Sequence, residues 1–290
     1  MLIKFAVKAQ GISHIEKEIP CQDACTAQLG LDETVGIACV ADGHGGNKYF
    51  RSDKGSKIAV QVAEKALSNF YGTIANEKTA FFNHKLENEE KQKSDIIAKL
   101  KQLEGNIIYQ WRNAVLKDYT ENPLTDTERV ICNDNKINFE DDPANFIFIY
   151  GTTLLAGLFT YNFWFIIQIG DGLCVILENE ETAITPIEED ERLAFGRTTS
   201  LCDNDAIKNF RECYGFTQID GFTVATDGIA DSFEPDKYIQ FNKELYYNFT
   251  TTPDKAQAEL EAFLPILSER GSRDDVSVAG IFRKRKNNNG

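Results

Sequence analysis

Four apolar segments of the sequence each meet an aspartate at one end, and these acids have the clearest chemical potential. Asp42, Asp171 and Asp227 follow their segments in CVADG, IIQIGDG and TVATDG, whereas Asp274 precedes the segment VSVAGIF. Neighbouring strands of an antiparallel sheet run in opposite directions, so a last strand that runs the other way brings all four acids to one edge. A fifth acid, Asp23 in PCQDAC, precedes another strand-like stretch. The pattern predicts a shared site at one sheet edge.

Carboxylates gathered at one edge repel one another unless a cation lies among them. Carboxylate and carbonyl oxygens are hard ligands that suit Mg²⁺, Mn²⁺ or Ca²⁺ rather than Zn²⁺. Gly43 lets the backbone approach such an ion, so its carbonyl oxygen is a further candidate ligand. The alternative is that each Asp-Gly pair is only a turn at a strand end, since Asp-Gly is a favoured turn dipeptide. The recurrence of the pattern favours the metal site.

Motifs of other phosphate-binding and hydrolytic sites do not occur in the sequence. It contains no D-x-[DN]-x-[DN]-G calcium loop, no G-x-x-x-x-G-K-[ST] phosphate loop and no G-x-S-x-G nucleophile elbow. The segment His44-Gly45-Gly46 therefore does not indicate an esterase oxyanion loop.

Hydrophobic periodicity predicts the strands and helices that must position these acids. Apolar residues that recur every three or four positions predict helices through residues 59–70, 96–115 and 255–267. Alternating or continuous apolar runs predict strands at residues 3–7, 34–40, 146–150, 153–160, 163–169, 174–178, 222–225 and 276–282.

The remaining segments are predicted to be irregular. Residues 120–145 hold two prolines and many Asn and Asp residues, which predicts a long loop or insert, and residues 185–215 are polar and irregular. The order of elements predicts an α+β fold in which helices cover mostly antiparallel sheets. We expect one domain over residues 1–282 and a disordered basic and Asn-rich tail over 283–290.

Charge and cysteine content limit the partners and the compartment. The 290-residue chain carries a net charge of −14, which disfavours nucleic acid and anionic membranes as partners. No apolar segment is long and continuous enough to span a membrane, and the first ten residues lack the apolar core of a secretory signal. The seven scattered cysteines are odd in number and include no C-x-x-C, so we expect neither a disulfide framework nor a structural zinc site, and a cytoplasmic location.

Six motifs together resemble a known family, the metal-dependent serine/threonine protein phosphatases of type 2C. The opening motif GISHIEKEIPCQDAC (11–25) resembles the form seen in bacterial members. The other five follow in the family's order: ADGHGG (41–46), GTT (151–153), IGDG (169–172), ATDGIADS (225–232) and GSRDDVSV (271–278). The resemblance runs from Gly11 to Phe282, so it covers nearly the whole chain.

This resemblance implies a four-layer α-β-β-α sandwich with two metal ions, Mn²⁺ or Mg²⁺, in the cleft between the sheets. Asp42 matches the acid that bridges both ions, and Gly43 matches the carbonyl ligand. Asp227 and Asp274 match the remaining ligands of the first ion, and Asp23 matches the acid that holds water at the second.

The same resemblance implies further roles at the edge of the metal pair. Asp171 and Asp231 match the acids that recruit a third, weaker ion in many members, and His44 matches the histidine that protonates the leaving oxygen. Two ions about 4 Å apart lower the pKa of a shared water and neutralise a phosphoryl group, while an acid assists the poor alkoxide leaving group. The implied activity is hydrolysis of phosphoserine and phosphothreonine in proteins that a serine/threonine kinase has phosphorylated.

Two positions depart from the family pattern. Gln22 stands where many members have a metal-contacting glutamate, and Glu18, five residues before Asp23, stands where an arginine usually grips the substrate phosphate. Lys17 and His14 are candidate substitutes, although a point charge does not reproduce the planar fork of arginine. The phosphate-binding residue is therefore unknown, and the better interpretation of His14 is an exposed side chain. Asp275 is interpreted as a support for Asp274 or for the backbone.

Three functional classes remain open from the sequence. The first is a metal-dependent phosphoprotein phosphatase. The second is a pseudophosphatase that recognises a phosphorylated partner without hydrolysis, which Glu18 favours. The third is a hydrolase of a small phosphorylated metabolite that uses the same metals.

Overall fold

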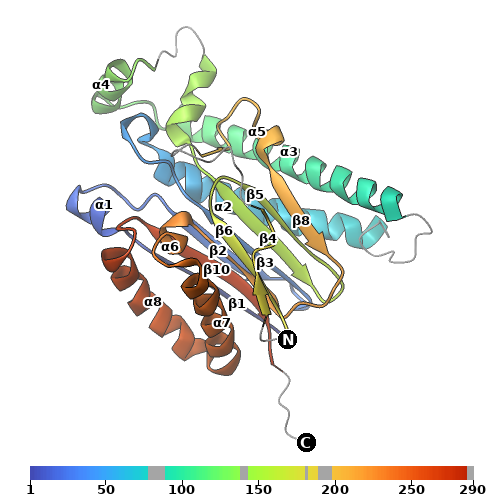
Figure 1. Ribbon diagram of the computed structural model, residues 1–290. Coiled ribbons are helices and arrows are strands. Elements are labelled where there is room, and N and C mark those ends of the chain that lie inside the picture. Colours follow the sequence, from blue (N-terminus) through green and yellow to red (C-terminus); the bar gives the residue numbers. More distant parts are fainter. Residues whose placement is uncertain (78–88, 138–142, 180–181, 189–197, 286–290) are drawn as a thin grey trace, which may run out of the picture.

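Two antiparallel five-stranded sheets form the centre of the molecule (Figure 1). The computed structural model describes residues 1–77, 89–137, 143–179, 182–188 and 198–285. The first sheet has the order β1 (Leu2–Ala9), β10 (Val276–Arg283), β9 (Gly221–Ala225), β6 (Leu173–Glu178) and β7 (Thr182–Ile184). The second sheet has the order β2 (Ala24–Leu29), β3 (Val35–Ala41), β4 (Leu154–Thr160), β5 (Trp164–Ile169) and β8 (Arg211–Gly215).

Long helices cover the outer face of each sheet. Helices α2 (Ser52–Glu77) and α3 (Glu89–Glu121) pack on the second sheet, and α7 (Pro235–Thr251) and α8 (Pro253–Arg270) pack on the first (Figure 1). The shorter helices are α1 (Ile12–Glu16), α4 (Asp126–Asp134), α5 (Ala206–Asn209) and α6 (Asp227–Ala230), with 3₁₀ turns at Asn47–Tyr49 and Pro143–Tyr150. The predicted α-β-β-α sandwich is confirmed.

Three apolar layers hold the sandwich together, and strand β3 shows how. Its side chains alternate between the two faces of the second sheet. Ile37 and Cys39 belong to the layer under the helices, whereas Ala38 and Val40 belong to the layer between the sheets. Because both faces are buried, the strand reads as a continuous apolar run and not as an alternation.

The helix pattern predicted for residues 96–115 is also confirmed. Ile96, Leu100, Leu103, Ile107, Trp111 and Val115 are all buried along α3. The indole nitrogen of Trp111 donates a hydrogen bond to the carbonyl oxygen of Gly55 in α2, at 3.0 Å. This stripe fixes α2 against α3.

Several predicted elements were wrong or incomplete. Residues 146–150 belong to the 3₁₀ turn Pro143–Tyr150, because a short buried apolar run does not distinguish a strand from a helical turn. The expected loop at 120–145 contains α4, which begins at a Thr125–Glu128 capping box. The expected irregular region contains strand β8 and helix α5, and helix α7 was not predicted. Residues 286–290 of the expected tail lie outside the described residues, while Arg283 belongs to β10.

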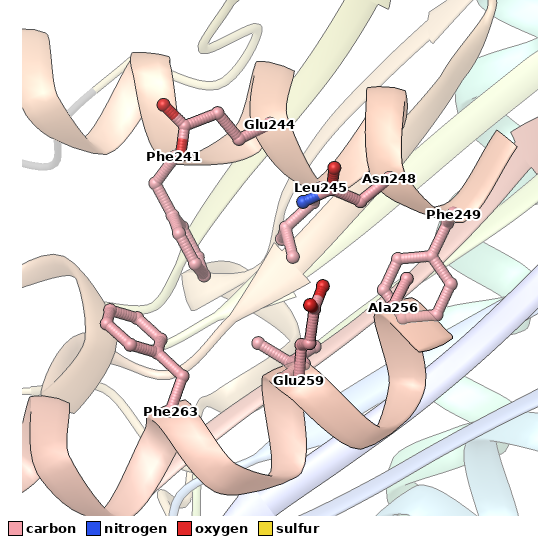
Figure 2. A pocket seen from close by; sticks show the side chains of 9 residues that line it. Phe241, Glu244, Leu245, Asn248, Phe249, Ala256, Glu259 and Phe263 are labelled. Atoms are coloured by element: carbon pink, nitrogen blue, oxygen red, sulfur yellow. The ribbon is translucent and has the colours of Figure 1, made fainter. Parts of the chain in front are cut away.

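The outer helical layer of the first sheet carries a groove of about 300 Å³ between α7 and α8. Figure 2 shows the rings of Phe241, Phe249 and Phe263 around it and the carboxylate of Glu259 pointing into it. None of the acids singled out from the sequence lines this groove. Over the described residues, no helix has the length and apolar character needed to cross a membrane.

Candidate metal centre

The acids predicted to share a site lie at one end of the sandwich, beside strand ends of both sheets. Asp42 and Asp171 follow β3 and β5 of the second sheet, whereas Asp227 follows β9 and Asp274 precedes β10 of the first. The prediction of a single sheet edge is therefore wrong. The chain crosses from one sheet to the other at Asp171, because β5 and β6 belong to different sheets.

Three of these acids come together closely. Carboxylate oxygens of Asp42, Asp171 and Asp227 all lie within 4.8 Å of one another. The charge of Asp227 also acts on Asp42 and raises its pKa. The end of each sheet thus contributes an acid, and the crossover between the sheets contributes the third.

The other three predicted acids lie around this group and outside it. Asp231 ends α6, one turn after Asp227, and its pKa is raised by burial and by the charges of Asp171 and Asp274. Asp274 has a half-exposed side chain, and its carboxylate lies 3.6 Å from Nε2 of His14. Asp23 is buried, and its carboxylate accepts a hydrogen bond from the Thr226 hydroxyl at 2.8 Å. The close group therefore contains Asp171 and not Asp274.

Three acids of the centre, Asp23, Asp42 and Asp227, have raised pKa values. Burial and the charges of Asp23 and Asp227 raise the pKa of Asp42 well above its ordinary value. Burial and neighbouring acids raise the pKa of Asp23 to about 8 and that of Asp227 to about 6. The main charges that act on Asp42 and Asp227 all belong to other aspartates. Crowded oxygen donors of one sign are the donor set that a hard divalent cation stabilises, so these residues fit Mg²⁺ or Mn²⁺.

Asp275 behaves differently from these acids, although it adjoins Asp274. Its carboxylate accepts hydrogen bonds from the backbone N–H of Gly11 and Gln22, both at 2.6 Å, and contacts His14 Nδ1 at 2.9 Å. Although burial opposes it, these bonds lower the pKa of Asp275. The interpretation of Asp275 as a backbone support is confirmed.

The Gly-Thr-Thr segment at 151–153 holds the Asp42 loop in place. The Asp42 N–H donates to the Thr153 hydroxyl at 2.9 Å, and the Asp42 carbonyl oxygen accepts from the Thr153 N–H at 2.8 Å. The Thr152 hydroxyl donates to the same carbonyl oxygen at 2.8 Å. This motif, singled out by resemblance, has a positioning role in the structure.

Two glycines are required by close approach. A Cβ atom at Gly43 would lie 2.6 Å from the carbonyl oxygen of Ser52, so only glycine lets the loop pass there. A Cβ atom at Gly151 would lie 2.7 Å from the His44 ring. The His44 ring also packs edge-on against Tyr49, with centroids 4.9 Å apart. Burial, with a smaller effect from Lys48, lowers the pKa of His44 to about 4, so the imidazole is neutral near pH 7.

The two departures from the family pattern have different surroundings. The Gln22 side-chain amide donates to the Ser52 hydroxyl at 2.6 Å and to the His44 carbonyl oxygen at 3.3 Å, so it links the Asp23 and Asp42 loops. Glu18 lies exposed on the turn after α1, with φ at +55°. That backbone conformation favours glycine, so the geometry of the turn constrains this position.

Sequence reasoning missed two residues that support the centre. Thr226 binds Asp23, and His14, interpreted as exposed, is largely buried and contacts Asp275. The interpretation of His14 is wrong because the ring lies against Asp274 and Asp275 and is only 12% exposed. The sequence held a hint of this contact. His14 belongs to the same motif as Asp23, and Asp275 was the acid of its motif without a metal-ligand role, so the two could have been expected to support the centre.

A family model and several solved structures match this chain. The family model described as Protein phosphatase 2C matches residues 10–265. The catalytic domain of the serine/threonine phosphatase PstP, solved with two manganese ions, has a TM-score of 0.53 at 16% identity over 97% of this chain and 99% of its own. PstP from Mycobacterium tuberculosis gives a TM-score of 0.54 at 16% identity, over 98% of this chain and 99% of its own.

A further solved structure, a bacterial serine phosphatase, gives a TM-score of 0.55 at 14% identity over 99% of this chain and 100% of its own. No curated protein matches the sequence significantly. The structural likenesses establish the fold, and the family match covers most of the sequence. The chain belongs to the protein phosphatase 2C family, the metal-dependent serine/threonine protein phosphatases.

Proposed function

We propose that this protein hydrolyses phosphoserine and phosphothreonine in proteins, with divalent ions held by the acids at the end of the sandwich. The proposed ligands are Asp23, Asp42, Gly43, Asp171, Asp227, Asp231 and Asp274. The observation that carries the proposal is the close group of Asp42, Asp171 and Asp227, whose charges repel one another. Bound divalent ions supply the positive charge that activates a water and neutralises the phosphoryl group.

The residues of the chain have separate tasks in this proposal. Asp42 and Asp227 hold the centre from opposite sheets, and Asp171 holds it from the crossover. Thr152 and Thr153 fix the Asp42 backbone, so the Gly43 carbonyl keeps one orientation. Rigid placement of this kind is what aligns a water with a phosphoryl group.

His44 is the proposed proton donor to the departing serine or threonine oxygen. Its neutral state in the structure is a consequence of burial. A phosphate dianion beside the ring favours the protonated form, because an opposite charge raises the pKa of a histidine. Substrate binding therefore supplies the charge that makes His44 an acid.

The proposal also covers the ion, the substrate and the location. Mn²⁺ is the proposed ion because the PstP catalytic domain was solved with two manganese ions, and Asp171 and Asp231 are the proposed ligands of a third ion. The proposed substrate is the product of a serine/threonine kinase. All seven cysteines are free, which supports a reducing, cytoplasmic location.

Family membership favours neither a pseudophosphatase nor a metabolite hydrolase. The deciding experiment measures phosphate release from a phosphothreonine peptide, a sugar phosphate and a nucleotide, with Mn²⁺ and with EDTA. We expect Mn²⁺-dependent release from the peptide that Asp42→Ala abolishes. Peptide binding without release supports the pseudophosphatase, and release only from the small molecules supports the metabolite hydrolase.

A further inference from the structure

The His14 ring lies between two adjacent acids of the turn before β10. Its Nδ1 is 2.9 Å from an oxygen of Asp275, and its Nε2 is 3.6 Å from an oxygen of Asp274. The side chain is 12% exposed, so the ring is held in this place by its surroundings. An ionised carboxylate only accepts hydrogen bonds, and therefore Nδ1 carries the proton that faces Asp275.

Asp275 connects two segments that are far apart in the sequence. Its two carboxylate oxygens accept from the N–H groups of Gly11 and Gln22, both at 2.6 Å. Gln22 immediately precedes Asp23, so the Asp275 carboxylate sets where the Asp23 loop begins. The Asp275 N–H donates to the Asp274 carboxylate at 2.8 Å, which couples the two neighbouring acids.

We propose that His14 is a positioning residue of the metal centre. Its ring holds the Asp275 carboxylate in one rotamer, and Asp275 in turn places the Asp23 loop and the carboxylate of Asp274. This inference rests on the proposed function, since it concerns the same metal ligands. Outer partners that orient metal ligands change metal affinity without touching the metal, typically by about 10- to 100-fold.

A second contact also holds α1 against this turn, and its effect has to be distinguished from that of the His14 ring. The Arg273 guanidinium donates to both oxygens of Glu16 at 2.8 Å, on an exposed surface. If α1 acted only by covering the turn, breaking this exposed pair would have the same effect as removing the ring. Glu16→Gln is therefore the matched control.

The chemistry of the ring suggests a pair of variants of similar polarity. In His14→Asn the amide nitrogen is attached to Cγ, as Nδ1 is, so it can still donate to Asp275. In His14→Gln the amide nitrogen lies one bond further out and reaches toward Asp274 instead. His14→Ala removes both contacts.

The first measurement uses the metal-free protein. Amide chemical shifts of Gly11 and Gln22 in ¹H–¹⁵N spectra report the hydrogen bonds to Asp275. We expect these two signals to move in His14→Ala and His14→Gln, and to stay near their wild-type positions in His14→Asn and Glu16→Gln. Equal shifts in the Asn and Gln variants, or unchanged signals in both, overturn the proposal, even where the Ala variant does not fold.

The second measurement is the affinity for Mn²⁺, by calorimetry, with the melting temperature as a check on folding. We expect about 10-fold weaker binding in His14→Ala and His14→Gln, and near wild-type affinity in His14→Asn and Glu16→Gln. Wild-type affinity in His14→Ala contradicts the proposal. Failure of the wild-type protein itself to bind Mn²⁺ contradicts the proposed function instead, and the metal-free spectra then decide the role of His14.

Discussion

Glu128 and Asp227 lie half-buried in two different regions of this molecule, and their pKa values move in opposite directions. At the start of α2, the Arg51 guanidinium donates to both oxygens of Glu128, at 2.7 and 2.9 Å, and to the Tyr150 hydroxyl at 2.8 Å. These bonds lower the pKa of Glu128 to about 2. At the end of the sandwich, burial and other acids raise the pKa of Asp227 to about 6.

This difference distinguishes an acid that is paired with a cation of the same chain from acids that require a bound cation. Glu128 has its cation within the chain, as a side chain fixed by further hydrogen bonds. Asp42 and Asp227 are surrounded by acids of the same charge. Burial of carboxylates without a counter-ion destabilises the folded state. Binding of an external cation offsets that destabilisation.

The largest expected effect comes from removing one acid of the close group. Asp42→Asn should lower Mn²⁺-dependent phosphate release by about 10³-fold or more, because one ligand and its charge are lost. The same change removes repulsion, so the melting temperature in EDTA should rise or stay unchanged. Phosphate release and thermal melting measure the two effects.

The control is Asp236→Asn, which changes an exposed acid in the first turn of α7. It should leave both quantities unchanged. An Asp42→Asn protein that melts well below the wild type in EDTA would contradict the claim that these acids repel one another.

The next largest effect is expected from breaking the ion pair between Arg51 and Glu128. Arg51→Met should lower the free energy of unfolding by about 3 kcal/mol, because the buried guanidinium with its hydrogen bonds is lost and the half-buried Glu128 is left without its counter-ion. Urea denaturation checks the size. Glu128→Gln together with Arg51→Met should recover part of the loss, and an Arg51→Met protein as stable as the wild type would show that the pair does not hold α4.

Metal binding should stabilise one region and not the other. Mn²⁺ at about 100 times its dissociation constant should add about 2.7 kcal/mol to the free energy of unfolding, through mass action. The increase should disappear in Asp227→Asn and persist in Arg51→Met. Equal stabilisation of the wild type and Asp227→Asn would place the bound metal elsewhere.

The smallest effect concerns the buried acid Glu104 of α3, which has properties of both regions. Burial raises its pKa to about 7, although Lys101 lies 2.9 Å away. A raised pKa means that the folded state binds the proton more tightly, so stability falls as the pH rises from about 4.5 to about 7. Glu104→Gln should therefore gain about 1–2 kcal/mol over the wild type near pH 8 and less near pH 5.

Urea denaturation at pH 5 and pH 8 tests whether the stability gain of Glu104→Gln is larger at the higher pH. The exposed acid Glu121 at the end of α3 offers the control, since Glu121→Gln should show no pH-dependent difference. A gain in Glu104→Gln that is larger at pH 5 would reverse the sign and contradict the argument.

The layered fold and the identity of the clustered acids could be predicted from the sequence. The distribution of these acids over the two sheets could not. Strand-end acids and ordered motifs identified Asp42, Asp171 and Asp227 as neighbours, because strand ends follow from periodicity. The sequence could not show that β5 and β6 lie in different sheets, since each strand alone is only an apolar run. That crossover places Asp171, and not Asp274, in the close group.

Hydrogen-bond partners distant in the sequence were also beyond prediction. His14 and Asp275 are separated by 261 residues, and periodicity carries no information about such a contact. Helix α4 was predictable in principle, because Thr125 and Glu128 form a capping box, but the surrounding Asn and Pro residues favoured a loop. Glu18 was compared with a phosphate-binding arginine, whereas its left-handed backbone places it on a turn.

The central claim is that acids from both sheets hold divalent ions between them. Calorimetric titration of the metal-free protein with Mn²⁺ tests it directly, with Asp42→Asn and Asp227→Asn beside the wild type. The account predicts binding of two ions by the wild type and a loss of affinity in each variant, although one acid belongs to each sheet. No measurable binding by the wild type, or the same isotherm in all three proteins, would contradict it.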